Sequence, residues 1–576
     1  MKHMNKVKRI AALGLAGLLS CGAFACTPPP AGGNSSSGGA TIGGGTSSGG
    51  SSGSAKGKTE LKIKVFNGGL GYQWILELAN NFMEKFKDVS FEEGKKGVFI
   101  ALTPNKEFSN LASNMAVGAD AEDIYYTSDC NFYNFMDVDV AYDVTDIMTA
   151  DVYNEDGEVE LNDTGDGWAT QSDSIADRIT VEHTANRLKV EVEGELEPHY
   201  FALPFDDSTA GIIVDWDLFK KKGWTNYNGI DGMPATWAEL KDLLGKIRKE
   251  GYSAFTFSTG VQYTRVIQAA VQAQVDGLET YYDLFSDYTG KYDFNGDGDT
   301  DDAGEIITPN TAYKLMDTRG YKAAVEMAAT MFEKTSAGKT YYDAGATTGL
   351  SFGAAQQDFV MSIETKKPIA MLLEGEWWEN EARATFNAMG DVNPEYGYGQ
   401  REFRMMPIPS FDSTNEDQKY TLGAWTGGAV TIVNKKTVDG NAAKEKVAEL
   451  WLQYQYSTEG LKCFSRHSGA TLPMEYDMDD KELEALTPFA RNLFKLRRDP
   501  RVQTVYNGVS LQNETVRRAA AQLSYATKLN NTNYTGTLFQ IALKMSKAGT
   551  KWTVAEYIEG MHTYQDNTIK AAFPAK

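Results

Sequence analysis

The stretch LKIKVFNGGLGYQWILELANNFMEKF, residues Leu61–Phe86, decides the fold class of this chain. Its first six residues alternate and are rich in β-formers, which predicts a strand that ends at the glycines of Asn67–Gly71. The apolar residues that follow are spaced at helical intervals: Trp74, Leu78, Phe82 and Phe86. A strand, a glycine loop and a helix in succession form the first βα unit of an α/β lobe.

Similar units recur along the chain. The predicted strands are Val98–Leu102, Asp123–Thr127, Gly211–Asp215, Ala254–Ser258 and Ile369–Leu373, and the predicted helices are Phe108–Val117, Trp237–Glu250 and Ala442–Gln455. Such alternation favours parallel sheets covered by helices. With a body that runs from about Thr59 to Lys576, we expect at least two lobes, because a single core rarely grows so large.

The N-terminal residues resemble an export signal. Met1–Arg9 is basic, and Ile10–Ala25 is apolar, rich in small residues and too short to span a membrane comfortably. Cys21 and Cys26 each stand in a setting like the lipobox of bacterial lipoproteins. We favour Cys26 as the lipidated residue, since a pure tether follows it at once; Cys21 is the alternative, and an ordinary secretory signal with incidental cysteines is a third possibility.

Thr27–Lys58 consists almost wholly of Ser, Gly, Pro, Ala and Thr. This composition cannot bury enough apolar surface to fold, and as flexible coil it has a reach of about 30 Å. We therefore expect residues 1–25 to be a signal peptide and 26–58 a lipidated linker that holds the body at the extracellular face of the cell membrane, with no other membrane contact.

The net charge and the cysteine content limit the possible functions of the chain. The formal net charge is −22, and the expected signal carries basic residues only, so the mature chain is more acidic still. This argues against a nucleic-acid partner, which requires a basic surface. Only Cys130 and Cys463 remain in the body. They either pair or both stay buried thiols, and nothing in their spacing supports pairing.

Several motifs, taken in order, resemble the extracellular solute-binding proteins that deliver carbohydrates to ATP-driven importers, of the maltodextrin-binding kind. The motifs are GGLGYQW (Gly68–Trp74), DIYYTSD (Asp123–Asp129), ALPFDDSTAGIIVDWDLF (Ala202–Phe219) with PATWAELKDLL (Pro234–Leu244), KKPIAMLLEGEWWEN (Lys366–Asn380), TLGAWTGGAVTIVNKK (Thr421–Lys436) and SRHSGATLP (Ser465–Pro473). The segment Val144–Glu197 and the tail beyond Pro473 fit only loosely.

This resemblance implies a two-lobed α/β fold of the type II periplasmic-binding-protein kind, with ligand between lobes that close by hinge motion. Residues 59–201 and 421–473 would form lobe 1, and residues 202–420 and 474–576 lobe 2. It also implies a monomeric, non-enzymatic receptor that binds an oligosaccharide and delivers it to the permease subunits of an ABC importer.

A pyranose has an apolar face and a rim of hydroxyls, so its site needs aromatic planes and hydrogen-bonding groups. In the family, the glycine turn that follows the Ala-Met strand carries a stacking Trp, which falls here on Trp377. The candidate planes are Tyr72, Trp74, Trp377, Trp378 and Trp425; the candidate hydrogen-bonding residues are Asp129, Asp206, Asp207, Glu376 and His467, with Arg401 as a further possibility. Packing inside a lobe is the alternative for each Trp, turn capping for the Asp pair, and surface charge for Arg401 and His467.

Tyr292–Ile306 (YDFNGDGDTDDAGEI) has the spacing of an EF-hand calcium loop through its ninth position. Acidic or amide residues stand at Asp293, Asn295, Asp297, Asp299 and Asp301, with Gly298 at the turn. The closing position is Gly304, so a bidentate closing ligand would have to come from Asp302 or from Glu305, one place late. We expect a structural Ca²⁺ that pins an insertion over residues 283–310; an acidic, solvated turn is the alternative.

Two other functions remain open. A secreted glycan-degrading enzyme would use carboxylates such as Glu374, Glu376 and Glu379, but such acids must face each other across the scissile bond, and three acids on one turn do not show that arrangement. A surface glycan adhesin would share the tether and the aromatic residues. Adhesins of this kind are expected to contain repeats, and the sequence shows none.

Overall fold

The computed structural model describes residues 54–572, except 107, 128–130, 206–208, 259–262, 303, 336, 412–418, 426–428, 509–525 and 530–531. All of these described residues belong to one compact unit, Ser47–Lys576. The expected signal, the tether and both candidate lipid-bearing cysteines, Cys21 and Cys26, lie outside them. Among the described residues no helix combines the length and apolarity needed to cross a membrane.

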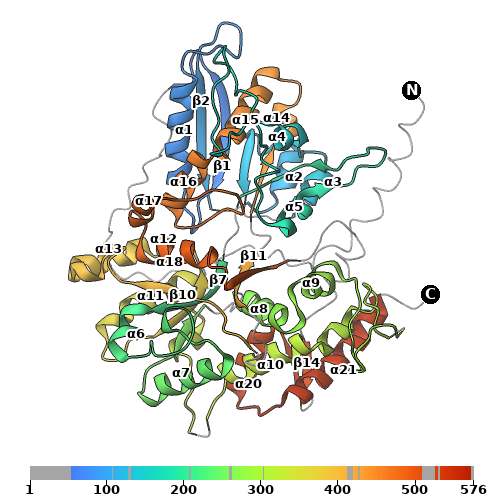
Figure 1. The fold of residues 1–576 in the computed structure, drawn as a ribbon, viewed down its shortest axis with the longest axis vertical. Helices are drawn as coiled ribbons and strands as arrows, with labels where there is room; N and C mark the ends of the chain where they lie inside the picture. The colour runs from blue at the N-terminus through green and yellow to red at the C-terminus, as the bar shows by residue number, and fades with distance from the viewer. Residues whose placement is uncertain are drawn as a thin grey trace, which may run out of the picture. The chain divides into compact units, whose positions relative to one another are not determined.

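The first lobe is built on a five-stranded sheet with the order β2-β1-β3-β12-β6 (Figure 1). Its strands are β1 (Thr59–Phe66), β2 (Val98–Asn105), β3 (Ile124–Thr127), β6 (Leu203–Pro204) and β12 (Val430–Val433). β1 runs parallel to β2 and β3, as the alternating units predicted. β12 runs antiparallel to both β3 and β6, so a strand from late in the chain lies inside the first sheet.

The helix α1 (Gln73–Lys85) covers this sheet with the face that its spacing predicted. Its buried residues are Trp74, Ile75, Leu78, Ala79 and Phe82. The other helices of this lobe are α2 (Leu111–Ala116), α3 (Tyr133–Asp137), α4 (Thr145–Thr149), α5 (Glu182–Leu188), α14 (Lys435–Val438), α15 (Ala442–Gln455), α16 (Thr458–Ser468) and α17 (Asp480–Glu484), with a small ribbon of β4 (Lys189–Val190) and β5 (His199–Tyr200).

The second lobe has a six-stranded sheet, in which β10 pairs with β7 beside the path β13-β11-β7-β9-β8. Its strands are β7 (Thr209–Asp215), β8 (Phe255–Phe257), β9 (Met371–Gly375), β10 (Phe403–Met406), β11 (Tyr420–Trp425) and β13 (Val502–Asn507). β7 is antiparallel to β9, β10 and β11, whereas β8–β9 and β11–β13 are parallel. The alternation favoured parallel sheets; this lobe departs from that expectation at β7, which the chain enters from the other lobe and not through a crossover helix.

The helices of the second lobe surround this sheet. They are α6 (Trp216–Lys222), α7 (Trp237–Lys249), α8 (Thr264–Asp276), α9 (Leu278–Tyr281), α10 (Arg319–Met331), α11 (Phe352–Met361), α12 (Trp378–Glu381), α13 (Arg383–Val392), α18 (Pro488–Arg497), α20 (Leu538–Ala548) and α21 (Val554–Ala572). Short helical turns are η2 (Ile230–Gly232), η3 (Tyr282–Asp287), η4 (Ala312–Asp317), η5 (Gly345–Thr348), η6 (Ser362–Glu364) and η7 (Pro394–Tyr396), and β14 (Ala526–Leu529) pairs with β15 (Thr532–Thr535). In Figure 1, α8 lies beside β11 and α10 beside α8.

The chain changes lobe at points that differ from those expected. We expected the return to the first lobe at Thr421, but β11 pairs in the second sheet, and the first sheet receives the chain only at β12. We expected the final departure after Pro473, yet Met474–Leu486 still contributes buried side chains to the first core. Each lobe thus closes its core with residues that are distant in sequence.

Candidate functional site

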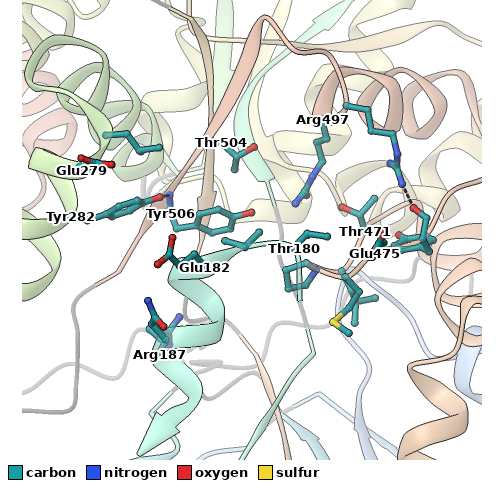
Figure 2. Close-up of a pocket in the computed structure, with 18 of the residues that line it drawn as sticks. Thr180, Glu182, Arg187, Glu279, Tyr282, Thr471, Glu475, Arg497, Thr504 and Tyr506 are labelled. Carbon is teal, nitrogen blue, oxygen red and sulfur yellow. Dashed lines mark hydrogen bonds between the residues drawn. The ribbon is translucent and has the colours of Figure 1, made fainter. Parts of the chain in front are cut away.

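A large pocket with a volume of about 1020 Å³ is lined by four separate segments (Figure 2). Residues within 180–187 and 471–476 come from the side of the first core, and residues within 278–287 and 497–506 from the side of the second sheet. Small-molecule pockets usually measure about 300–1000 Å³, so this one has room for a ligand longer than a single sugar ring.

The pocket combines aromatic rings with groups that donate and accept hydrogen bonds. Tyr282 and Tyr506 supply rings, and Arg187 and Arg497 supply guanidinium groups. The carboxylates are those of Glu182, Glu279, Asp283, Asp287 and Glu475. In Figure 2 the Tyr506 ring and the Arg497 side chain extend into the pocket, with Thr180 and Glu182 across from them. Such a lining can stack on an apolar face and bond to surrounding hydroxyls.

Backbone contacts hold the walls of this pocket. On one side, Thr180 N donates to Pro473 O at 3.0 Å, which ties the two first-core segments together. Arg178, only 4% exposed, donates to carbonyl oxygens of Gly157, Tyr456 and Glu475 at 2.6–3.1 Å. On the other side, Tyr506 N donates to the Tyr282 hydroxyl at 3.2 Å. These hydrogen bonds therefore hold the backbone of the pocket walls in place.

Arg497 connects the pocket to the turn that follows β9. Its guanidinium donates to Thr209 Oγ1 at 3.1 Å and lies 3.5 Å from the carboxylate of Glu376. Glu376 is only 2% exposed, and its backbone N–H donates to Thr209 O at 2.8 Å. The predicted site residue Glu376 thus does not line the large pocket but balances the charge of an arginine that does.

Trp377 is half-buried and packs against apolar residues of both lobes. Its ring lies edge-on to Tyr263, with centroids 5.4 Å apart. The glycine loop that follows β1 presses against it: a Cβ at Gly69 would come within 2.5 Å of the Trp377 ring, so only glycine fits there. Asn380 Nδ2 also donates to Gly69 O at 2.6 Å. Two of the motif loops singled out in the sequence therefore meet at Trp377.

Two predicted stacking residues lie inside the cores instead. Trp74 is 0% exposed and meets Tyr126 and Phe464 edge-on at 5.5 Å and 5.2 Å. Trp378 is also 0% exposed and packs edge-on to Phe403 at 4.9 Å. The expectation that these rings face a ligand is wrong for this structure. Trp74 begins the helical series that runs to Phe86, and that periodicity already pointed to the core.

The remaining predicted binding residues are scattered. Tyr72 is half-buried against the first core just before α1. His467, on α16, contacts Glu77 Oε2 at 2.8 Å and lies away from the large pocket. Trp425 pairs in β11 with Asn507, and its side chain lies outside the described residues, as do Asp129, Asp206 and Asp207. Of the body cysteines, Cys463 is buried and free, and Cys130 is not among the described residues.

Arg401 forms a buried ion pair inside the second lobe. Arg401 is 4% exposed and contacts Asp215 Oδ2 at 2.6 Å, and Asp215 is 1% exposed. A second nitrogen of the guanidinium donates to Val360 O at 2.9 Å. Arg401 is therefore a buried structural cation and does not line the pocket of about 1020 Å³.

The acids that a hydrolase would need are buried. Glu374 is 0% and Glu379 is 3% exposed, and neither lines the large pocket. Burial raises the pKa of Glu379 to about 7 and the pKa of Glu374 well above its ordinary value. Glu376 and Glu379 border a small cavity of about 20 Å³. None of the three stands where it could flank a glycosidic bond in the large pocket.

The acidic loop lies between η3 and η4, away from the pocket lining. Carboxylate oxygens of Asp293, Asp297 and Glu305 all fall within 4.8 Å of one another. Asn295 Nδ2 donates to Asp297 Oδ2 at 2.9 Å, and their neighbours Asp299 and Asp301 are both exposed. The structure thus brings three of the six predicted ligands together: Asp293, Asp297 and Glu305.

Sequence reasoning missed the pocket residues Arg187, Tyr282, Arg497 and Tyr506. Arg497 and Tyr506 belong to the tail beyond Pro473, where the sequence resembles the family only loosely. The sequence does show aromatic and basic pairs there and at Tyr281–Tyr282, but such pairs are also common on ordinary surfaces. Only the folded chain shows that these positions share a pocket.

No protein-family model matches the chain, and no curated protein matches it. Solved structures do. A chitin oligosaccharide binding protein aligns with a TM-score of 0.50 at 12% identity, over 89% of this chain and 99% of the other. The apo form of RafE from Streptococcus pneumoniae aligns with a TM-score of 0.51 at 11% identity, over 90% of this chain and 98% of the other. At these identities the likeness is one of fold: the chain shares the two-lobed α/β fold of these two proteins.

Proposed function

We propose that this protein is a lipid-anchored extracellular receptor that binds an oligosaccharide and presents it to the permease of an ABC importer. The pocket of about 1020 Å³, with walls from both lobes and a lining of tyrosines, arginines and carboxylates, carries the proposal. Walls on two lobes suit a ligand that is enclosed when the lobes close. One of the structures with the same fold is named as a chitin oligosaccharide binding protein, which supports the same ligand class here.

The N-terminal sequence supports the anchored location. A lipid on Cys26, or on Cys21, followed by a Ser/Gly-rich linker of about 30 Å reach would keep the binding body concentrated beside its permease. The permease subunits would be separate chains. The strongly acidic body also fits a small uncharged or mixed ligand better than a polyanion.

A hydrolase is the rival function. Its requirement for two opposed carboxylates is not met by Glu374, Glu376 and Glu379, which are all at most 3% exposed. Isothermal titration of the full chain against a panel of oligosaccharides, with analysis of the sugars after long incubation, separates the two functions. The receptor should bind at least one glycan and return it intact; the release of shorter sugars would establish the hydrolase instead.

Trp377→Ala is expected to weaken glycan binding by about 1–3 kcal/mol, which is about 5- to 150-fold in Kd. Trp377 does not line the pocket itself; it is the half-buried aromatic where the motif loops meet and packs against both lobes, so its loss removes an aromatic plane beside the lobe contact and the support that it gives to Gly69. The measurement is the same titration with the variant.

The neighbouring Trp378→Phe is the matched control, because Trp378 is 0% exposed and packs only inside the second lobe. It should lower the thermal midpoint while leaving Kd unchanged. An unchanged Kd for Trp377→Ala, with the control behaving as stated, would place the ligand away from this turn.

A further inference from the structure

The acidic loop is a closed excursion from the second lobe. A bridge between Lys291 and Ile306 and a hydrogen bond from Tyr292 N to Glu305 O at 3.0 Å shut its base. Between these points the sequence holds six acids and no Lys or Arg: Asp293, Asp297, Asp299, Asp301, Asp302 and Glu305. Gly296 and Gly298 take the positive φ values of 79° and 97° that its tight turns require.

Three carboxylates of this loop converge. The ligand atoms of Asp293, Asp297 and Glu305 lie within 4.8 Å of one another. Like charges at this separation repel, and the one nearby lysine with a bond to the loop, Lys314, donates to the Gly304 carbonyl and not to these carboxylates. Among the described residues no ion pair or hydrogen bond joins a cation to these three carboxylates; Arg319 attracts Asp293 only through space.

Glu305 gives a second and independent sign of a ligand. Its side chain is only 2% exposed, and its Oε2 accepts from Asp302 N at 3.2 Å. Its Oε1 is fully buried and accepts no hydrogen bond from the described residues. Burying a carboxylate oxygen without a partner is costly, so an oxygen in this position is normally bonded to a donor or to a metal ion.

The sequence left the closing ligand of the loop open, since its twelfth position is Gly304. In the structure Glu305 N donates to Asp302 O at 3.0 Å, and this turn brings the later residue to the cluster. Glu305 therefore takes the place of the usual closing glutamate from one position further along. The loop is an EF-hand-like site with one residue added before its last ligand.

We propose that this loop binds one Ca²⁺, held by carboxylates of Asp293, Asp297 and Glu305. In the EF-hand scheme the side-chain oxygen of Asn295, the backbone carbonyl of Asp299 and a water on Asp301 complete the shell. The donors are all hard oxygens, with no His or Cys among them, which selects Ca²⁺ over zinc and similar ions. The flexible acidic loop favours Ca²⁺ over the smaller, strictly octahedral Mg²⁺.

The bound ion would also stabilise one wall of the pocket, because a small apolar core connects the loop to that wall. Leu284, Tyr288, Tyr292, Ile307, Ala312 and Leu315 form this core. Leu284 belongs to η3, which also carries the pocket residues Tyr282, Asp283 and Asp287. Tyr292 OH donates to Asp276 Oδ1 at 2.7 Å, which links the loop to α8. A core of so few apolar residues stabilises the insertion only weakly, and a bound metal ion would add the missing stability.

Thermal unfolding of the full chain, stripped with a chelator and then titrated with CaCl₂ or MgCl₂, tests the proposal. Calcium should raise the midpoint by several degrees and saturate at or below about 1 mM, the upper end for extracellular sites, because an ion held only by the folded state stabilises it. Magnesium at the same concentration should do much less. No calcium shift, or an equal shift with magnesium, overturns the assignment.

Glu305→Gln should abolish the calcium shift, since it removes the buried charge while it keeps the side-chain shape. Asp163→Asn is the matched control: it lies exposed in another acidic turn, next to Asn162, and should keep the full shift. If Glu305→Gln does not fold, terbium luminescence of the wild-type chain decides: emission that calcium displaces supports the site, and none overturns it. No sugar enters these measurements, so they stand or fall separately from the receptor function.

Discussion

Asp215→Ala is expected to lower the free energy of unfolding by about 3–5 kcal/mol, because it leaves the Arg401 guanidinium buried without a counter-charge. The two side chains are 1% and 4% exposed, and they join at 2.6 Å between the end of β7 and the segment that leads into β10. Asp215 Oδ1 also accepts from Leu218 N at 3.0 Å, which caps α6. Urea unfolding of the wild type and the variant measures the loss.

A double replacement tests whether the loss comes from the stranded charge. Asp215→Leu combined with Arg401→Met removes both charges and fills the same space, so it should recover most of the stability that the single replacement loses. A single Asp215→Ala variant that loses less than about 1 kcal/mol would show that water or another group compensates the arginine.

The stability of the wild type should fall as the pH rises from about 4.5 to 7, in part because of Glu379. Burial raises the pKa of this group from an ordinary value of 4.5 to about 7. Below pH 4.5 it is neutral in both states, and its contribution to stability is fully present. Between pH 4.5 and 7 only the unfolded state ionises, so the contribution is lost, and above pH 7 the curve is flat. The change amounts to about 3 kcal/mol.

Glu379→Gln isolates this contribution, since glutamine keeps the shape and can still accept a hydrogen bond from Thr487 Oγ1 at the same place. The measurement is the free energy of unfolding by urea at several values between pH 4.5 and 7.5. The variant should lose less stability over this range than the wild type. Parallel curves for the two proteins would mean that Glu379 titrates normally and that water reaches its carboxylate.

The individual strands and helices were predictable because the spacing of their apolar residues follows the period of a strand or a helix. The strand expected at Leu61–Phe66 is β1, the expected helix Ala442–Gln455 is α15, and the expected strand at Gly211–Asp215 lies within β7. Strand partners were not predictable. β11 and β12 are separated by only a few residues, yet they belong to different sheets. The sheet that each of these strands joins depends on which sheet edge is open to it, and those edges are formed by distant parts of the chain.

Aromatic residues show why the site was only partly predictable. Trp377 and Trp378 are neighbours on one turn, but the first is half-buried between loops and the second packs against Phe403 inside the core. Sequence shows that a Trp follows a glycine turn; it does not show which way the ring points. Tyr506 and Arg497, by contrast, gain their place in the pocket from β13 and α18, whose positions depend on long-range pairing.

The place of β12 inside the first sheet also has a consequence for the order in which the molecule forms. β3 has one partner from early in the chain, β1, but its other edge stays open until Val430–Val433 has been made. The second sheet likewise waits for β13, Val502–Asn507, beside β11. Neither lobe can be finished from a contiguous early stretch, so both mature together at the end of synthesis. Assembly is therefore paced by distant strand pairing, during which open strand edges are exposed to other chains.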